Sequence, residues 1–412
     1  MNTTSQNNKL KRADLCRSQA FVSGQWCDAD NGETFAVSNP ATGETLAMLP
    51  RFGIAETERA IAAADNALPE WRQRSAKERA TLLRRWYQLM LDHQEDLATL
   101  LTLEQGKPLA ESRGEILYGA SFIEWFAEEA KRVYGDIIPG FTADRRIMVI
   151  KQPVGVVAAI TPWNFPNAMI TRKLGPALAA GCTVVLKPAS ETPLSALALA
   201  ALAEEAGIPA GVINVVTGSA SVIGPTLTRS PIIRKISFTG STDVGRRLMA
   251  ESAATLKKMS LELGGNAPFI VFEDADLDAA VQGLMASKFR NSGQTCVCTN
   301  RVLVQASVHD AFVEKLRNAV AKLQVGNGLQ EGTTQGPLIN NAALVRIEGL
   351  LANLQNSGAR VVCGGNRHAL GGTFFEPTVI TGVKNSSSLA QEELFAPIAP
   401  VIALHEALDR QI

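Results

Sequence analysis

The sequence predicts an α/β protein built from two doubly wound open sheets. A chain of 412 residues is too long for one ordinary core, so two domains are expected. Its apolar content of 46% with 19% charged residues is typical of a well-buried globular protein. From residue 154 onward, apolar strands alternate with helices, which indicates parallel sheets covered on both faces.

Charge and cysteine content narrow the function. Lysine plus arginine equals aspartate plus glutamate at 40 each, so no net field favours nucleic acid or an anionic membrane, and a small ligand is expected. The 6 cysteines are irregularly spaced, which predicts a reducing, cytoplasmic location without disulfides. No Cys-x-x-Cys or nearby histidine completes a metal site.

The start of the chain is not expected to be a secretory signal or a membrane span. Residues 1–20 lack an apolar segment and are expected to form a frayed tail, and an organellar transit segment is the weaker alternative because the start is mildly basic. The apolar run 194–203 is too short to cross a membrane.

Helices follow a short hairpin near the start. Ser23-Gly24 predicts a tight turn, and residues 56–134 have helical spacing, with Trp86 and Met90 on one buried stripe. Residues 146–152 are expected to form an exposed strand that pairs with another subunit or another domain, and the subunit is favoured.

The alternating segments divide into two sets. The first set contains the strands VGVVAAI, TVVLK, VINVVTG and KISFTG, with a helix after each. The second begins near residue 267 with PFIVF and continues with RVLVQ and ARVVCGG, and the strand PVIAL and the opening of a helix are expected at the end of the chain. The predicted domains are 1–134 with 154–264 for cofactor binding, 135–153 as an oligomerisation hairpin, and 265–412 for catalysis.

Cys296 is the candidate nucleophile. It follows the run Asn291-Ser292-Gly293-Gln294-Thr295, which is small and polar and is expected to be a flexible segment at an open helix end. A cysteine taken alone is more often a small buried apolar residue, so the assignment depends on the rest of the chain.

Two candidate cofactor contacts lie at strand ends. Residues 238–245, FTGSTDVG, follow a strand and open a helix whose N–H groups could hold a phosphate. Because its glycines are five apart, this is not the Gly-x-Gly-x-x-Gly motif, and an ordinary turn is the alternative. Lys187 ends TVVLK at the edge where such sheets bind ligands, although a solvated lysine is the alternative.

Two polar residues complete the candidate chemistry. Asn164, between two prolines, could aim its amide at a developing oxyanion, or it could be a turn residue that bonds its own backbone. Glu262 lies in an apolar strand before two glycines, where burial would raise its pKa towards that of a general base.

Taken together, these motifs resemble the NAD(P)-dependent aldehyde dehydrogenase superfamily from about Phe21 to the end of the chain, with a Rossmann-like cofactor domain and a catalytic domain. The resemblance implies that Cys296 is the nucleophile, that Asn164 and the Cys296 N–H form the oxyanion hole, and that Glu262 activates water. The cofactor-binding residues that it implies are Thr161, Pro162, Trp163, Lys187, Ser190, Gly240, Ser241, Gly245, Leu263, Glu393 and Phe395.

Within the superfamily the chain is similar to succinate-semialdehyde dehydrogenases, which act in 4-aminobutyrate degradation. By similarity, Arg172 and Arg290 bind the distal carboxylate of the substrate, and glutarate semialdehyde is the rival substrate. Ser190 stands where NAD-preferring relatives often carry glutamate, so NADP is preferred and NAD is possible. Cys296 and Cys298 are expected to form a reversible redox pair, as in some relatives.

The resemblance also implies segments beyond Ile412 and a full-length tetramer or dimer, and Ala396 replaces a glycine usual in relatives. A C-terminally truncated chain is therefore expected. Two other functions stay open: an inactive truncated product that binds nucleotide, and a thiol esterase that uses Cys296 and Glu262 without a cofactor.

Overall fold

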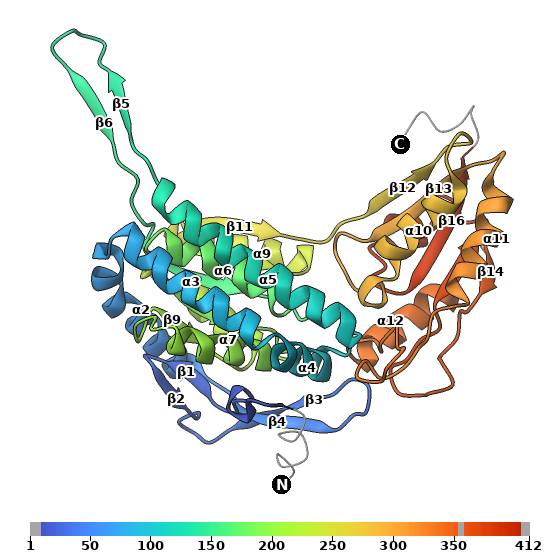
Figure 1. Ribbon diagram of the computed structural model, residues 1–412, viewed down its shortest axis with the longest axis horizontal. Helices are drawn as coiled ribbons and strands as arrows, with labels where there is room; N and C mark the ends of the chain where they lie inside the picture. The colour runs from blue at the N-terminus through green and yellow to red at the C-terminus, as the bar shows by residue number, and fades with distance from the viewer. Residues whose placement is uncertain (1–9, 353–357, 405–412) are drawn as a thin grey trace. The chain divides into compact units, whose positions relative to one another are not determined.

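The computed structural model describes residues 10–352 and 358–404, and the chain forms two compact units (Figure 1). Unit 1 comprises Met1–Val37, Thr45–Leu101 and Arg113–Glu262, and unit 2 comprises Ser38–Glu44, Thr102–Ser112 and Leu263–Ile412. The two short segments of unit 2 fall in the range that the sequence assigned to the first domain. They belong to unit 2 because they bond to it, as when the Leu109 N–H donates to the Gly328 carbonyl over 2.9 Å.

Unit 1 contains a seven-stranded sheet in the order β11-β10-β7-β8-β9-β1-β2. Strands β7 to β11 pair in parallel, and β1 joins β9 in the antiparallel sense. The strands are β1 (Ala20–Val22), β2 (Gln25–Cys27), β7 (Val156–Ile160), β8 (Thr183–Lys187), β9 (Ile213–Val215), β10 (Ile233–Thr239) and β11 (Lys258–Glu262).

Helices cover both faces of this sheet, which confirms the predicted doubly wound architecture. Helices α2 and α8 contact one face, with α9 packed on α8, whereas α6 and α7 contact the other face, with α3 packed on both. The helices are α2 (Ile54–Gln73), α3 (Ala76–Asp92), α4 (Gln94–Gln105), α5 (Leu109–Glu129), α6 (Ala168–Ala179), α7 (Leu194–Glu205), α8 (Ala220–Arg229) and α9 (Thr242–Ser252), with 3-10 turns η1 (Ala13–Leu15), η2 (Ala130–Arg132) and η3 (Ala253–Thr255). No helix of the described residues is long and apolar enough to span a membrane.

Residues 10–20 pack against the rest of unit 1, so the expected frayed tail is wrong for them. Leu10 and Leu15 are buried, and the Lys11 N–H donates to Asp96 over 2.7 Å. The predicted turn at Ser23-Gly24 joins β1 to β2, and both residues have positive φ.

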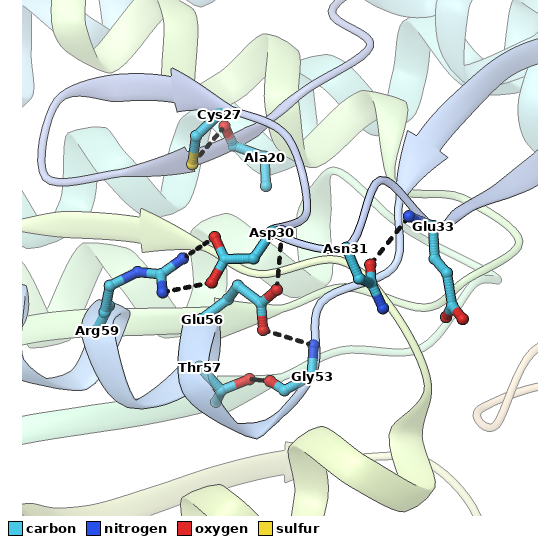
Figure 2. A network of polar contacts seen from close by, with 9 residues as sticks. All are labelled: Ala20, Cys27, Asp30, Asn31, Glu33, Gly53, Glu56, Thr57 and Arg59. Carbon is cyan, nitrogen blue, oxygen red and sulfur yellow. Dashed lines mark hydrogen bonds and ion pairs between the residues drawn. The ribbon is translucent and has the colours of Figure 1, made fainter.

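A polar network joins the segment after β2 to the start of α2 (Figure 2). The buried Glu56 carboxylate accepts the N–H groups of Asp30 and Gly53, each over 3.0 Å. Arg59 binds the Asp30 carboxylate with two nitrogens, each at 2.7 Å. Next in the chain, β3 (Thr34–Ser38) and β4 (Thr45–Pro50) form a separate two-stranded sheet.

An exposed hairpin leaves unit 1 after α5. Strands β5 (Asp136–Pro139) and β6 (Arg146–Val149) pair with each other and with no other described strand, and they extend away from α3 and α5 (Figure 1). All their residues are exposed, including Ile137 at 74% and Met148 at 75%. The predicted exposed strand at residues 146–152 is thus one half of a hairpin.

Unit 2 contains a five-stranded sheet in the order β12-β13-β16-β15-β14, in which β14 alone is antiparallel. Alternate residues of β13 face two cores: Val302 and Val304 pack with α10 and α11, whereas Leu303 packs with α12 and α13. The elements are β12 (Ala267–Val271), α10 (Leu277–Lys288), η4 (Arg290–Gly293), β13 (Thr299–Gln305), α11 (His309–Val320), α12 (Asn341–Ala352), β14 (Arg360–Cys363), β15 (Thr378–Thr381), α13 (Ser388–Gln391) and β16 (Ile398–Leu404). The sequence did not predict β15, and the start of a helix expected after residue 404 lies outside the described residues.

Candidate active site

Several predicted cofactor residues lie at the carboxyl edge of the unit 1 sheet. The chain runs outward from β7 to β9 on one side and from β10 to β11 on the other, so the winding reverses between β7 and β10. Open α/β sheets bind ligands beyond the strand ends at such a switch point. The residues at these ends are Thr161, Pro162, Trp163 and Asn164 after β7, Lys187 in β8, and Gly240 and Ser241 after β10.

Lys187 and Thr161 place buried polar groups at the ends of adjacent strands. Lys187 is 5% exposed, and burial lowers its pKa to about 8, although the charge of Glu191 opposes the shift. Its Nζ donates to the Pro188 carbonyl over 2.9 Å. The buried Thr161 hydroxyl has no hydrogen-bond partner among residues 10–352 and 358–404. A buried ammonium and an unpaired hydroxyl fit a ligand that carries phosphate and hydroxyl groups, as a nicotinamide dinucleotide does.

The start of α9 provides the second part of this edge. Ser241 is the N-cap, and its Oγ accepts the Val244 N–H over 3.4 Å. The Gly240 N–H donates to the Glu262 carbonyl over 3.1 Å, which ties this turn to β11, and Gly245 is buried in the first turns of α9. Ser190 lies on the loop after β8, where its hydroxyl donates to the Gly218 carbonyl over 3.3 Å.

Asn164 is 4% exposed, and a residue that the sequence did not single out anchors the loop after it. The buried Glu115 carboxylate of α5 accepts the N–H groups of Asn167 and Ala168 over 2.9 and 3.2 Å. Glu115 therefore holds the start of α6. One glutamate within a long helix looks like a solvent-facing residue, so the sequence offered no signal for this role.

Arg172 and Glu262 line one cavity of about 530 Å³ within unit 1. Glu262 ends β11 and is exposed, so the expected buried carboxylate is wrong. The reason is that β11 lies at the edge of the sheet that the described residues form, where it pairs with β10, and alternates between exposed and half-buried residues.

Lys173 is a further charged group of this cavity that sequence reasoning missed. It is 6% exposed, and its Nζ donates to Ser237 Oγ over 3.2 Å and to Thr239 Oγ1 over 2.8 Å. Burial lowers its pKa to about 8, while the Glu262 charge acts in the opposite direction. The available signal was helical spacing, since Lys173 lies four residues after the buried Met169.

In the nucleophile loop of unit 2, residues 289–298, the run 291–295 is buried rather than flexible, which corrects the sequence-based expectation. Asn291, Ser292 and Gln294 are each at most 2% exposed. The Ser292 hydroxyl donates to the Gly336 carbonyl over 2.9 Å, and the Gln294 side chain accepts the Ile339 N–H over 3.0 Å. Cys296 is half-buried within this fixed frame.

Three consecutive residues of this loop have left-handed backbone conformations. The φ angles are 49° at Asn291, 54° at Ser292 and 70° at Gly293. A Cβ on Gly293 would lie 2.0 Å from the carbonyl oxygen of Ala396, so only glycine fits. Ala396 itself does not have a positive φ, and the left-handed residue of its turn is Phe395, at 50°.

Cys298 lies at the base of the loop, beside a buried lysine. It is 6% exposed, and its Sγ is 3.5 Å from the Gly293 carbonyl oxygen and 3.9 Å from Lys288 Nζ. Burial lowers the pKa of Lys288. No disulfide joins cysteines in the part of the chain that the structure describes, and the redox pairing of Cys296 with Cys298 stays a prediction. Arg290 opens η4 and is exposed.

Glu393 and Phe395 lie on the segment before β16. Glu393 accepts the Gly265 N–H over 3.3 Å, and burial raises its pKa, which Arg346 and Lys288 partly offset. The buried Asn300, which the sequence did not identify, accepts the Leu394 N–H over 2.8 Å and donates to the Glu392 carbonyl over 2.8 Å.

The predicted site residues thus fall into two sets, one in each unit. Unit 1 carries Thr161, Pro162, Trp163, Asn164, Arg172, Lys187, Ser190, Gly240, Ser241, Gly245 and Glu262, and unit 2 carries Leu263, Arg290, Cys296, Cys298, Glu393 and Phe395. The described residues contain no cluster of three His, Cys, Asp or Glu side chains suited to a metal ion.

Comparison with known proteins places this arrangement in a family. The chain is 65% identical over 393 residues to a glutarate-semialdehyde dehydrogenase of Pseudomonas aeruginosa, covering 95% of this chain and 81% of that protein. It is 61% identical over 401 residues to the succinate-semialdehyde dehydrogenase [NADP(+)] of Escherichia coli, covering 97% and 83%. A crystal structure of an NADP-dependent enzyme from E. coli superposes with a TM-score of 0.96 at 61% identity and covers 97% of this chain and 83% of that one. Residues 26–410 match the aldehyde dehydrogenase family, and the chain belongs to that family.

Proposed function

We propose that this protein oxidises a short aldehyde with a distal carboxylate, succinate semialdehyde in the first place, to the corresponding acid with NAD(P) and water. The observation that carries the proposal is the position of Arg172, which lines the same cavity as Glu262. No carboxylate of the described residues forms an ion pair with Arg172, so its guanidinium suits a carboxylate from the substrate.

The chemistry follows from the residues in the two units. The Cys296 thiolate adds to the aldehyde carbon, and the amide of Asn164 with the Cys296 N–H stabilises the alkoxide. NAD(P), held at the ends of the unit 1 strands, would supply the hydride acceptor for this oxidation, and Cys296 would then carry the product as a thioester. Glu262 removes a proton from the water that cleaves the thioester, and the buried ammonium of Lys173 attracts the Glu262 charge.

The cofactor proposal rests on the carboxyl edge of the unit 1 sheet. Lys187, Thr161 and Ser241 would bind phosphate and hydroxyl groups, and Glu393 and Phe395 of unit 2 would bind the nicotinamide ribose and ring. Serine rather than glutamate at position 190 avoids a negative charge where a 2′-phosphate would bind, so NADP is preferred and NAD is possible. The E. coli relative is named for NADP(+), which supports this preference.

Glutarate semialdehyde is the second candidate substrate. The Pseudomonas aeruginosa relative is named for it, and one methylene group changes discrimination in a pocket by only about 10- to 200-fold. Both substrates have a terminal carboxylate, so both would use Arg172.

We also propose that the hairpin of β5 and β6 joins subunits. The side chain of Phe141, at the tip of the hairpin, is 89% exposed, and those of Ile137 and Met148 are 74% and 75% exposed. Exposed apolar side chains on a two-stranded ribbon without a third strand favour pairing with another copy of the chain.

The test compares wild-type protein with Arg172→Leu and Cys296→Ala, following the absorbance of the reduced cofactor. Wild-type protein is expected to prefer succinic or glutaric semialdehyde over butanal, Arg172→Leu to lose that preference, and Cys296→Ala to lose all turnover. An unchanged preference in Arg172→Leu, or equal use of butanal by the wild type, would contradict the proposal.

A further inference from the structure

Arg172 is held by two aromatic side chains of α5. Its Nη2 donates a hydrogen bond to the Tyr118 hydroxyl. Its guanidinium carbon lies 4.9 Å from the centre of the Phe122 ring and 5.7 Å from that of Tyr118. The two rings also contact each other edge to face, with centres 4.8 Å apart and planes at 63°.

These contacts fix one orientation of the arginine. Tyr118 and Phe122 are four residues apart in α5, so they lie on the same face of the helix, and all three residues belong to unit 1. A guanidinium near ring faces is attracted through its positive charge, and carboxylates bind it through its N–H groups. Tyr118 takes one of the five N–H donors, so the pair restrains Arg172 while other N–H donors remain for a carboxylate.

We propose that Tyr118 and Phe122 are positioning residues for substrate selection, which hold Arg172 ready for the distal carboxylate before the substrate arrives. The inference rests on the proposed function, in which Arg172 binds that carboxylate. A loose arginine would have to give up rotamer freedom at the moment of binding, and the aromatic pair removes that cost from the binding step.

Two variants separate the hydroxyl from the ring. Tyr118→Phe removes only the hydrogen bond, and Phe122→Leu removes the nearer ring. Each is expected to raise KM for succinic semialdehyde about three- to tenfold, the range for mobilising one side chain, with kcat and the KM for butanal within about twofold of wild type. Trp125→Leu is the matched control, because Trp125 is an exposed aromatic residue of α5 and, among the described residues, Arg172 makes its cation–π contacts with Tyr118 and Phe122 instead; it should leave all three values unchanged.

The same changes in an Arg172→Leu background distinguish positioning from a structural effect. If Tyr118 acts through Arg172, adding Tyr118→Phe to Arg172→Leu leaves KM for the semialdehyde unchanged. A further rise in that background, or an equal rise in KM for butanal, would overturn the inference. If Arg172→Leu lowers the semialdehyde preference but both aromatic variants retain wild-type KM, the positioning role is wrong and the proposed function stands.

A binding measurement gives the same ranking without turnover. Succinate is the probe, and it is expected to raise the Tm of wild type and of Trp125→Leu to the same extent. In Tyr118→Phe and Phe122→Leu, the same rise in Tm is expected to need about three- to tenfold more succinate. Identical succinate dependence in wild type and both aromatic variants would overturn the positioning role. In Arg172→Leu, succinate is expected not to raise Tm, whether or not the aromatic pair has a positioning role. If succinate still raised the Tm of Arg172→Leu, that result would count against the proposed function.

Discussion

Gly293→Ala should destabilise unit 2 through two effects that a matched control separates. The first is the left-handed φ of 70°, which costs a residue with a Cβ about 1–2 kcal/mol. The second is the contact of 2.0 Å that the new Cβ would make with the Ala396 carbonyl oxygen. Relieving it requires movement of the nucleophile loop or of the segment before β16, which adds about 1–3 kcal/mol. The total expected loss of unfolding free energy is therefore about 2–5 kcal/mol.

Gly371→Ala is the control for the backbone effect alone. Gly371 also lies in unit 2, its φ is 71°, and nothing lies within 4 Å of a Cβ built on it. Urea unfolding followed by circular dichroism measures both variants, and tryptophan fluorescence reports on unit 1, because all 5 tryptophans lie there. If Gly293→Ala and Gly371→Ala lose equal stability, the contact with Ala396 does not constrain the loop and the reasoning fails. Since that contact fixes the loop carrying Cys296, kcat should fall in Gly293→Ala and stay at the wild-type value in Gly371→Ala.

Three further predictions concern charge and redox chemistry. The pKa of Lys173 is about 8 in the folded protein and 10.5 ordinarily, so the unfolded state binds the proton of this lysine more tightly. Burying the charged ammonium therefore destabilises the folded state fully below pH 8. The free energy of unfolding should rise between about pH 8 and 10.5, by up to about 3 kcal/mol. Lys173→Met should lose that rise in urea unfolding, and an unchanged pH profile would count against a buried ammonium. Ser190→Glu should raise KM for NADP relative to that for NAD by about tenfold or more, measured in initial rates, and a constant ratio would show that position 190 does not face the 2′-phosphate. After peroxide treatment, wild-type activity should recover with dithiothreitol, whereas Cys298→Ala should not recover, and equal recovery would exclude Cys298 as the redox partner.

The sheets were predictable because their strands are buried on both faces. β7 and β8 are short, mainly apolar runs between glycines and prolines. This pattern predicts a strand that is buried on both faces, whatever side chains pack against it. β15 was not predicted because its four residues, TVIT, are too few to show a periodicity and they follow a glycine-rich loop, although β-branched residues favour a strand. The sequence also did not predict that β11 lies at the edge of its sheet. Whether β11 has one neighbouring strand or two depends on the order of strands in space, and with one neighbour Glu262 is exposed rather than buried.

Long-range hydrogen bonds explain the site residues that were missed. Glu115 is separated by more than fifty positions from the N–H groups that it accepts, and Asn300 by more than ninety from Leu394. Neither is part of a local motif, and each shares its element with other polar residues, so the sequence does not mark it as the buried one. Their roles follow only from burial, because a buried carboxylate or amide must find partners wherever the fold supplies them.

The nucleophile loop contains left-handed backbone conformations that cost free energy, and the sequence alone does not reveal them. Among the described residues, five that are not glycine have positive φ, and three of them, Asn291, Ser292 and Phe395, lie in the two segments of unit 2 that carry Cys296 and Glu393. Such conformations cost about 1–3 kcal/mol each and persist only where surrounding contacts hold them. Here the contacts are buried hydrogen bonds of the loop and its close approach to Ala396. Asparagine, serine and glycine tolerate a left-handed backbone better than most residues, so a run of them is predicted to be flexible from sequence. The same tolerance lets the run adopt left-handed conformations in the structure, where burial then holds it in place.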